Sequence, residues 1–146
     1  MTRAPLRGEC HCGSVRVLFD ASRPLDELPL RACTCSFCRR HGALYTSDPH
    51  GHLHIEAAPG AVEPYRFGTL TAEFLMCAEC GCYVAATMET GDGLLAVLNV
   101  RGVDLPGFEG RVPEPTSFED ESAETRIAGR RGRWTPAVLV EAQPNA

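Results

Sequence analysis

The cysteines are the residues of this sequence with the clearest capacity for chemistry. There are eight of them, arranged as Cys10-x-Cys12, Cys33-x-Cys35-x-x-Cys38 and Cys77-x-x-Cys80, with Cys82 just beyond the last motif. A Cys-x-x-Cys turn, or an extended Cys-x-Cys pair, brings two thiolates to one side of the chain, where both can bind one tetrahedral ion at about 2.3 Å. These spacings favour metal binding over disulfides, because a chain of 146 residues is long enough to bury its own core.

Two of the cysteine pairs together predict a closed structural zinc site. Cys10 and Cys12 lie near the start of the chain, Cys77 and Cys80 lie at its middle, and each pair is followed by glycine. Four thiolates on one zinc ion would tie the two segments together, with an apparent contribution to folding on the order of 10 kcal/mol. The alternative is that these cysteines are simply buried thiols.

The middle cluster supplies three sulfurs, Cys33, Cys35 and Cys38, and no obvious fourth ligand. Three protein ligands with one open position are typical of a catalytic zinc. Two alternatives stay open at this stage. The site could be closed by Cys82, His41 or Asp48, or Cys35 and Cys38 could form a metal-free redox pair, although the βαβ pattern of a thioredoxin is missing.

Composition and charge exclude several classes of function. The net charge is −5, and all 14 basic residues are arginine, so Schiff-base chemistry on a lysine is excluded. An acidic chain disfavours nucleic-acid binding. No segment has the roughly 20 apolar residues of a membrane helix, and residues 1–7 lack the apolar run of a secretory signal, so we expect a cytoplasmic protein with no membrane partner.

The elements that position the cysteines are expected to be mostly β-strands within one domain over residues 1–146. Alternating apolar residues predict strands over 15–19, 52–56, 65–67 and 73–77, and segments 83–88 and 94–100 flank a Glu89–Gly93 hairpin turn. A short helical turn is expected at about 36–41, a loop over 106–115 and a flexible tail over 142–146. The acidic run 119–124 and the basic run 126–133 are interpreted as solvated surface, with an amphipathic or ion-paired stretch as the alternative.

Three motifs together resemble a known family. The segments Gly8–Val15, Cys33–Ala43 and Phe74–Gly81 are similar to those of the glutathione-dependent formaldehyde-activating enzyme and centromere protein V family, over about residues 7–105. The resemblance implies a mainly β, β-tent fold of stacked antiparallel sheets. It also implies a structural zinc on Cys10, Cys12, Cys77 and Cys80 and a catalytic zinc on Cys33, Cys35 and Cys38, which makes two Zn²⁺ per chain.

The resemblance has weaker parts and departures. Asn99 and Trp134 lie where the family often has similar residues. Cys82 is not part of the usual pattern, and we expect it to be a buried core thiol rather than a spare ligand or a reactive thiol. The C-terminal third matches poorly, so we expect differences in specificity to arise there.

The resemblance implies carbon–sulfur lyase chemistry, in which a glutathione-like thiol is joined to formaldehyde or another small aldehyde, as in an S-hydroxymethylglutathione synthase. Arg39 and Arg40, directly after the third ligand, are candidates to bind the carboxylates of the thiol, with ordinary surface arginines as the alternative. The competing function is a non-catalytic zinc scaffold for a protein or nucleic-acid partner.

The histidines are less informative. His41 could relay a proton, although a structural role is the more common one. His50, His52 and His54 would share one face of an extended segment, and we interpret them as a solvated strand edge rather than a third metal site.

Overall fold

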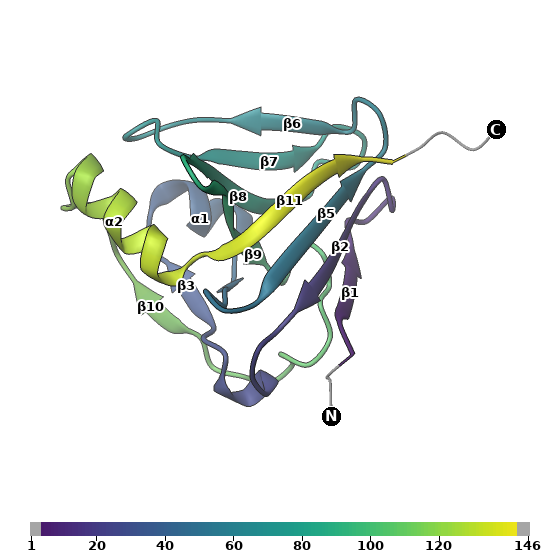
Figure 1. The fold of residues 1–146 in the computed structure, drawn as a ribbon, viewed down its shortest axis with the longest axis horizontal. Coiled ribbons are helices and arrows are strands. Elements are labelled where there is room, and N and C mark those ends of the chain that lie inside the picture. Colours follow the sequence, from purple (N-terminus) through teal and green to yellow (C-terminus); the bar gives the residue numbers. More distant parts are fainter. Residues whose placement is uncertain (1–3, 143–146) are drawn as a thin grey trace.

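The computed structural model describes residues 4–142 and shows a mainly β protein (Figure 1). The β-strands are β1 Leu6–Glu9, β2 Val15–Asp20, β3 Arg31–Cys33, β4 Tyr45–Thr46, β5 His52–Ala57, β6 Val62–Tyr65, β7 Glu73–Cys77, β8 Tyr83–Thr90, β9 Gly93–Asn99, β10 Glu114–Thr116 and β11 Thr135–Glu141. The α-helices are α1 Ser36–His41 and α2 Ala123–Arg133, and a 3₁₀ turn spans Leu25–Glu27. The mainly β class, the strand at 73–77 and the short helix at 36–41 confirm the expectations from the sequence.

The strands form one large mixed sheet that branches at β9. One edge of β9 pairs along its length with β8, which continues the sheet through β7 to β6. The other edge pairs first with β11 and then with β4, leading to β5, β2 and β1 in one direction and to β3 and β10 in the other. The hairpin expected around Glu89–Gly93 is confirmed as the β8–β9 turn.

Two strand pairs differ from the antiparallel arrangement that was expected. β11 runs parallel to β5, and β10 runs parallel to β3. Parallel neighbours need a long connection between them. Both pairs meet that condition, because many residues separate β5 from β11 and β3 from β10.

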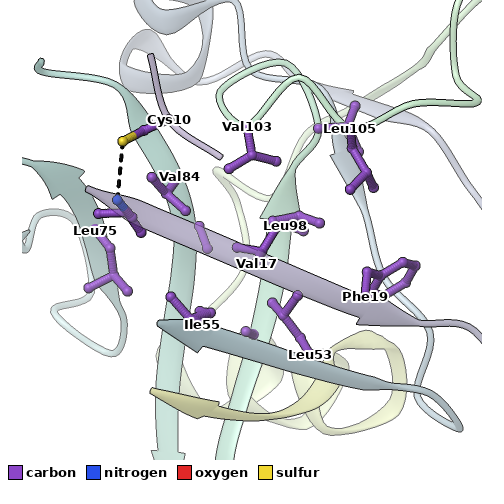
Figure 2. Close-up of a cluster of buried hydrophobic side chains, with 14 of the residues drawn as sticks. Cys10, Val17, Phe19, Leu53, Ile55, Leu75, Val84, Leu98, Val103 and Leu105 are labelled. Carbon is purple, nitrogen blue, oxygen red and sulfur yellow. Dashed lines mark hydrogen bonds between the residues drawn. The ribbon is translucent and has the colours of Figure 1, made fainter. Parts of the chain in front are cut away.

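The core between the branches is built by strand alternation. Val17 and Phe19 of β2 and Leu53 and Ile55 of β5 point to the same interior, where they meet Leu98 of β9 (Figure 2). Burying each such side chain contributes about 1.5–3 kcal/mol. This interior cluster therefore supports the sheet on which the cysteine turns are mounted.

The β8–β9 hairpin separates this core from a second apolar cluster. Ala85 and Leu98 face the first core, whereas Ala86 and Val97 face a smaller cluster that includes Cys38 and Trp134. All of β8 from Tyr83 to Met88 is consequently buried. The second cluster places the three-cysteine segment against the sheet.

The C-terminal segment differs most from the expectation. The acidic and basic runs are not simply solvated surface, because residues 123–133 form α2, in which Arg130 is buried. Ser122 is the N-cap of the helix. Its hydroxyl accepts a hydrogen bond from the Thr125 N–H group, and this capping bond stabilises the first turn. The expected loop over 106–115 is also shortened at its end, where Glu114 begins β10.

Candidate metal centres and their cavity

The four-cysteine cluster brings together two turns that are far apart in sequence. Cys10 and Cys12 lie in the turn between β1 and β2, and Cys77 and Cys80 lie at the end of β7 and in the turn after it. Their four Sγ atoms all lie within 4.8 Å of one another. The Sγ atom of Cys12 lies 3.8 Å from the Sγ atom of Cys10 and 3.6 Å from that of Cys77.

These separations fit one shared ion and not a disulfide. Four sulfurs at about 2.3 Å from a tetrahedral zinc are about 3.8 Å apart, whereas a disulfide bond is about 2.05 Å long. All eight cysteines of the chain are free thiols. The cluster can therefore hold a metal ion, as expected from the sequence.

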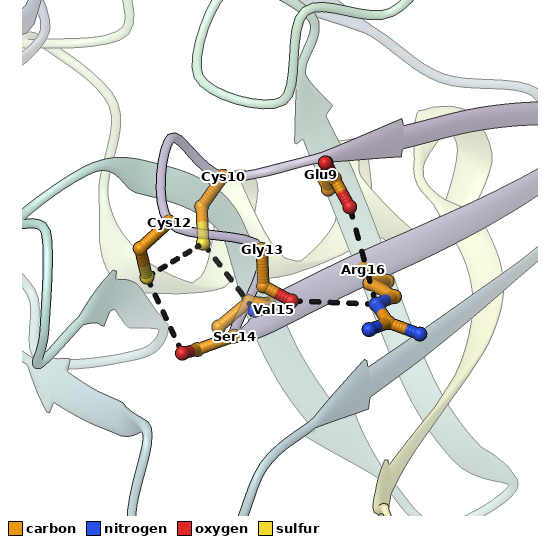
Figure 3. A network of polar contacts seen from close by, with 7 residues as sticks. All are labelled: Glu9, Cys10, Cys12, Gly13, Ser14, Val15 and Arg16. Atoms are coloured by element: carbon orange, nitrogen blue, oxygen red, sulfur yellow. Dashed lines mark hydrogen bonds and ion pairs between the residues drawn. The ribbon is translucent and has the colours of Figure 1, made fainter.

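The backbone of both turns is shaped around the sulfurs. Gly13 and Gly81, which follow the two pairs, have φ angles of 81° and 79°, a left-handed conformation that glycine adopts without strain. The Val15 N–H group donates to Cys10 Sγ at 3.3 Å (Figure 3). On the opposite turn, the Cys82 N–H group lowers the pKa of Cys80 to about 5, whereas burial raises the pKa of Cys77 to about 12.

The three-cysteine cluster is local in the chain. Cys33 ends β3, Cys35 is the N-cap of α1, and Cys38 lies inside this helix. Their Sγ atoms lie within 4.8 Å of one another. The Cys38 N–H group donates to Cys35 Sγ at 3.4 Å, so that the cap of the helix is itself one of the three sulfurs. This cluster can also hold a metal ion.

Within residues 4–142, no fourth Cys, His, Asp or Glu ligand joins this cluster. Of the three candidates from the sequence, His41 is exposed and packs on Phe37, with ring centroids 4.6 Å apart. Asp48 accepts hydrogen bonds from Ser22 and from the His50 N–H group. Cys82 lies beside the four-cysteine centre, where its carbonyl oxygen accepts a hydrogen bond from the Cys77 N–H group.

The sulfurs of the middle cluster have unlike environments. A hydrogen bond from Cys38 lowers the pKa of Cys33 to about 6, while the same interaction and burial raise the pKa of Cys38. Cys38 Sγ lies 3.0 Å from the Tyr45 hydroxyl, which lies 2.7 Å from the Tyr83 hydroxyl. Because burial raises the pKa of both tyrosines, they stay neutral, and Tyr45 can donate to a Cys38 thiolate.

Asn99 positions this pair of tyrosines. Its side-chain oxygen accepts from the Leu44 N–H group at 3.0 Å, and its side-chain nitrogen donates to the Tyr83 carbonyl oxygen at 2.9 Å. The side chain is only 2% exposed. Asn99 thus has a structural role that the family resemblance alone did not define.

All three cysteines of the middle cluster line a cavity of about 360 Å³, a size within the usual range of small-molecule sites. One part of its wall is apolar and consists of Phe67, Phe74, Ala86, Val97 and Trp134. Another part carries the charged side chains Arg31, Glu119, Glu121, Arg126, Arg130 and Arg133. A small molecule with both apolar and charged parts would fit such a wall.

The structure does not bring Arg39 and Arg40 to this cavity. Both are exposed, neither lines the cavity, and the Arg39 Nε–H group donates to the Thr34 carbonyl oxygen at 3.0 Å. The arginines at the cavity come instead from β3 and from residues 126–133. The signal for them was the basic run near the C-terminus, but its sequence did not show which side the arginines would face.

The three histidines that share one face of an extended segment do not form a metal group within the described residues. His50 and His52 are exposed, and His54 Nε2 lies 4.0 Å from Glu56. His52 and His54 lie in β5, which is between β2 and β11 and is therefore not an edge strand, and His50 lies in the turn before it. Cys82 is partly buried and packs against the first core, so the expectation of a fully buried thiol is only partly met.

Comparison with known proteins finds one family whose model covers both cysteine clusters. The family model described as glutathione-dependent formaldehyde-activating enzyme matches residues 5–109. The chain belongs to this family. A crystal structure of a Rhodobacter sphaeroides protein is similar to it, with 30% sequence identity and a TM-score of 0.58, covering 75% of this chain and 99% of that one. No curated protein matches the chain.

The family match contains all seven clustered cysteines and ends before α2. The arginines of α2 that line the cavity are therefore outside the region that the family model describes. In the described part of the chain, none of the helices is long and apolar enough to cross a membrane.

Proposed function

We propose that this protein is a zinc-dependent carbon–sulfur lyase that joins a glutathione-like thiol to formaldehyde or another small aldehyde. The observation that carries the proposal is a set of three cysteines that line a cavity of small-molecule size and have no fourth protein ligand among the described residues. The name of the family supports the substrate pair. Cys33, Cys35 and Cys38 are the proposed catalytic metal ligands.

The donor sets fit zinc at both centres. Thiolate sulfur is a soft ligand that zinc accepts, and the 3.6–3.8 Å separations at the four-cysteine cluster suit a tetrahedral ion. Cys10, Cys12, Cys77 and Cys80 would hold a structural zinc, and the three-cysteine cluster would hold a second one. When bound there, the second zinc lowers the pKa of an incoming thiol.

The reaction itself needs few other groups from the protein. A bond forms between the thiol sulfur and the aldehyde carbon, and the thiol proton ends on the aldehyde oxygen, so no oxidant or reductant is required. Tyr45 holds Cys38 through its hydroxyl group, and Phe74 and Trp134 keep the adjacent wall apolar. The cavity would increase the rate mainly by holding thiol and aldehyde together.

The proposal is tested with cobalt in place of zinc, because the visible absorption of Co²⁺ reports its ligands. Glutathione should change the spectrum of the wild-type protein and should not change that of a Cys35→Ser variant, which keeps only the four-cysteine centre. Elemental analysis should give two zinc ions per wild-type chain. A wild-type spectrum that does not change when glutathione is added would contradict thiol activation and would favour a non-catalytic scaffold.

A further inference from the structure

Helix α2 presents a row of arginines to the cavity. Arg126, Arg130 and Arg133 are spaced by four and three residues, which places them on one face of a helix. All three line the cavity, whereas Arg131 is exposed and does not. In Figure 1, α2 lies at the same end of the molecule as α1, which carries Cys38.

Arg130 is a buried cation without an anionic partner in the described residues. It is 7% exposed, and its Nη1 group donates to the Thr71 hydroxyl at 2.6 Å and lies 3.8 Å from Met88 Sδ, both of which are neutral. Burial and the charges of Arg126 and Arg133 lower its pKa to about 10, so it stays charged at neutral pH. Buried charges are normally paired, and an unpaired one favours the binding of an anion.

Two further arginines share this environment. The Arg126 Nε–H group is buried and has no hydrogen-bond partner, although its Nη2 group donates to the Phe118 carbonyl oxygen. Arg31 has a lowered pKa because of burial and the charge of Arg133. Within residues 4–142, none of these arginines forms an ion pair within 4.0 Å.

Aromatic rings hold two of the guanidinium groups in place. The Cζ atom of Arg130 lies 4.9 Å from the ring centre of Trp134, and that of Arg133 lies 4.8 Å from the ring centre of Phe118. Stacking on a ring uses the face of a guanidinium group, so its N–H edges stay available to a ligand.

The acidic residues of the wall do not cancel this charge. Glu119 and Glu121 line the cavity together with the four arginines, which leaves a formal excess of two positive charges. One Glu121 carboxylate oxygen is buried and has no hydrogen-bond partner. The charge of Glu121 raises the pKa of Arg130, but in the described residues Glu121 forms no ion pair within 4.0 Å with any of these arginines. Three thiolates with one Zn²⁺ would add only one negative charge, and the cavity would remain cationic.

We propose that Arg31, Arg126, Arg130 and Arg133 form a subsite that binds a carboxylate of the substrate and selects charged substrates over neutral ones. The inference rests on the proposed function, because the carboxylate belongs to the thiol or to the aldehyde that shares the cavity. Arginine binds carboxylates in a two-pronged geometry that suits such selection. The subsite comes from the chain outside the family match, apart from Arg31.

The test uses S-methylglutathione, whose sulfur is blocked, so that binding reports the carboxylates and not thiol activation. We expect the zinc-loaded protein to bind it at least about tenfold more tightly than its diethyl ester, and added salt should weaken the binding. Arg126→Gln and Arg133→Gln should each weaken it about fivefold to twentyfold. The matched control Arg131→Gln, on the other side of the same helix, should bind like wild type.

Glyoxylate distinguishes the source of the carboxylate. If the aldehyde carries it, glyoxylate should bind in a manner that depends on Arg126 and Arg133, while S-methylglutathione does not. Equal binding of S-methylglutathione and its ester, together with glyoxylate binding that is unaffected by both substitutions, would overturn the subsite. Zinc content and a thermal melt test whether each variant is folded. If one variant is not, the salt dependence of binding to the wild-type protein still tests the subsite.

The two proposals fail separately. A cobalt spectrum that does not change when glutathione is added would contradict the proposal of thiol activation. Arginine-dependent binding of S-methylglutathione would still establish the subsite. A normal spectral response combined with charge-independent binding would remove the subsite and leave the lyase proposal intact.

Discussion

The two cysteine clusters use the same ligand atom but are built into the chain in opposite ways. The four-cysteine centre joins two turns that are far apart in sequence, since Cys12 and Cys77 are separated by 65 positions, and it packs against the first core. The three-cysteine centre arises within six residues, at one end of a short helix, and opens onto a cavity. Joining distant segments stabilises a fold, whereas a local cluster with an unfilled ligand position can serve a reaction.

The largest expected effect is on the closed centre. Cys77→Ser removes one of four sulfurs and leaves the β1–β2 turn without its link to β7. We expect aggregation or loss of a cooperative melt, because structural zinc contributes on the order of 10 kcal/mol in apparent terms. Circular dichroism during heating measures this. A Cys77→Ser protein that melts like wild type would contradict a structural role.

Cys35→Ser should act on the open centre alone. We expect a folded protein with one zinc ion instead of two and no lyase activity, because the cluster closes no long loop of the chain. Elemental analysis, a thermal melt and an activity assay measure these three properties. If Cys35→Ser and Cys77→Ser melt alike, the division between a structural and a catalytic centre is wrong.

A test at Asp48 distinguishes a structural carboxylate from a metal ligand. Burial would raise its pKa, but hydrogen bonds from the Ser22 N–H and hydroxyl groups and from the His50 N–H group outweigh burial and lower it. Its stabilisation is therefore complete above the unfolded pKa of about 3.9 and is lost as the pH falls through the lower folded value.

Asp48→Asn should lower the free energy of unfolding at neutral pH by about 2 kcal/mol. The difference between the two proteins should shrink as the pH falls from about 4 through the lower pKa of the folded state, where the wild-type carboxylate becomes protonated. Urea titrations at several pH values measure this difference, and zinc content should stay at two ions per chain. Loss of one zinc ion in this variant would instead identify Asp48 as a ligand.

Tyr45→Phe tests the support behind the open centre. The substitution removes the hydroxyl group between Cys38 and Tyr83. We expect zinc at the open centre to bind about tenfold more weakly, since groups that hold metal ligands contribute at this level. Competition with a chelator measures the affinity. Tyr65→Phe, in an exposed ring of the same aromatic cluster, is the matched control and should bind zinc normally.

The smallest effect is expected at Cys82, which lies beside the closed centre but outside its group of four sulfurs. Cys82→Ala should keep both zinc ions and change the free energy of unfolding by less than about 1 kcal/mol. Elemental analysis and a melt suffice here. A lost zinc ion would show that Cys82 is a fifth, alternative ligand.

Sequence patterns predicted the local features of the fold well. The β8–β9 hairpin could be predicted because a Gly-Asp-Gly turn lies between two apolar strands, and the short helix expected at about 36–41 is α1. The strand at 62–65 was displaced from the expected 65–67. Its burial is slight, so alternation carries little information there.

The sequence by itself determined which cysteines lie together within each motif, because the spacing already places two or three sulfurs on one side of the chain. Tertiary structure alone decided what surrounds the open centre. Arg39 and Arg40 adjoin Cys38 in sequence yet face solvent, whereas Arg126 and Arg130 reach the cavity from far along the chain. The position of α2 depends on packing against the second core and on the β11 strand that follows it. The periodicity of a helix shows which face packs, but it does not show against which distant part of the chain that face packs.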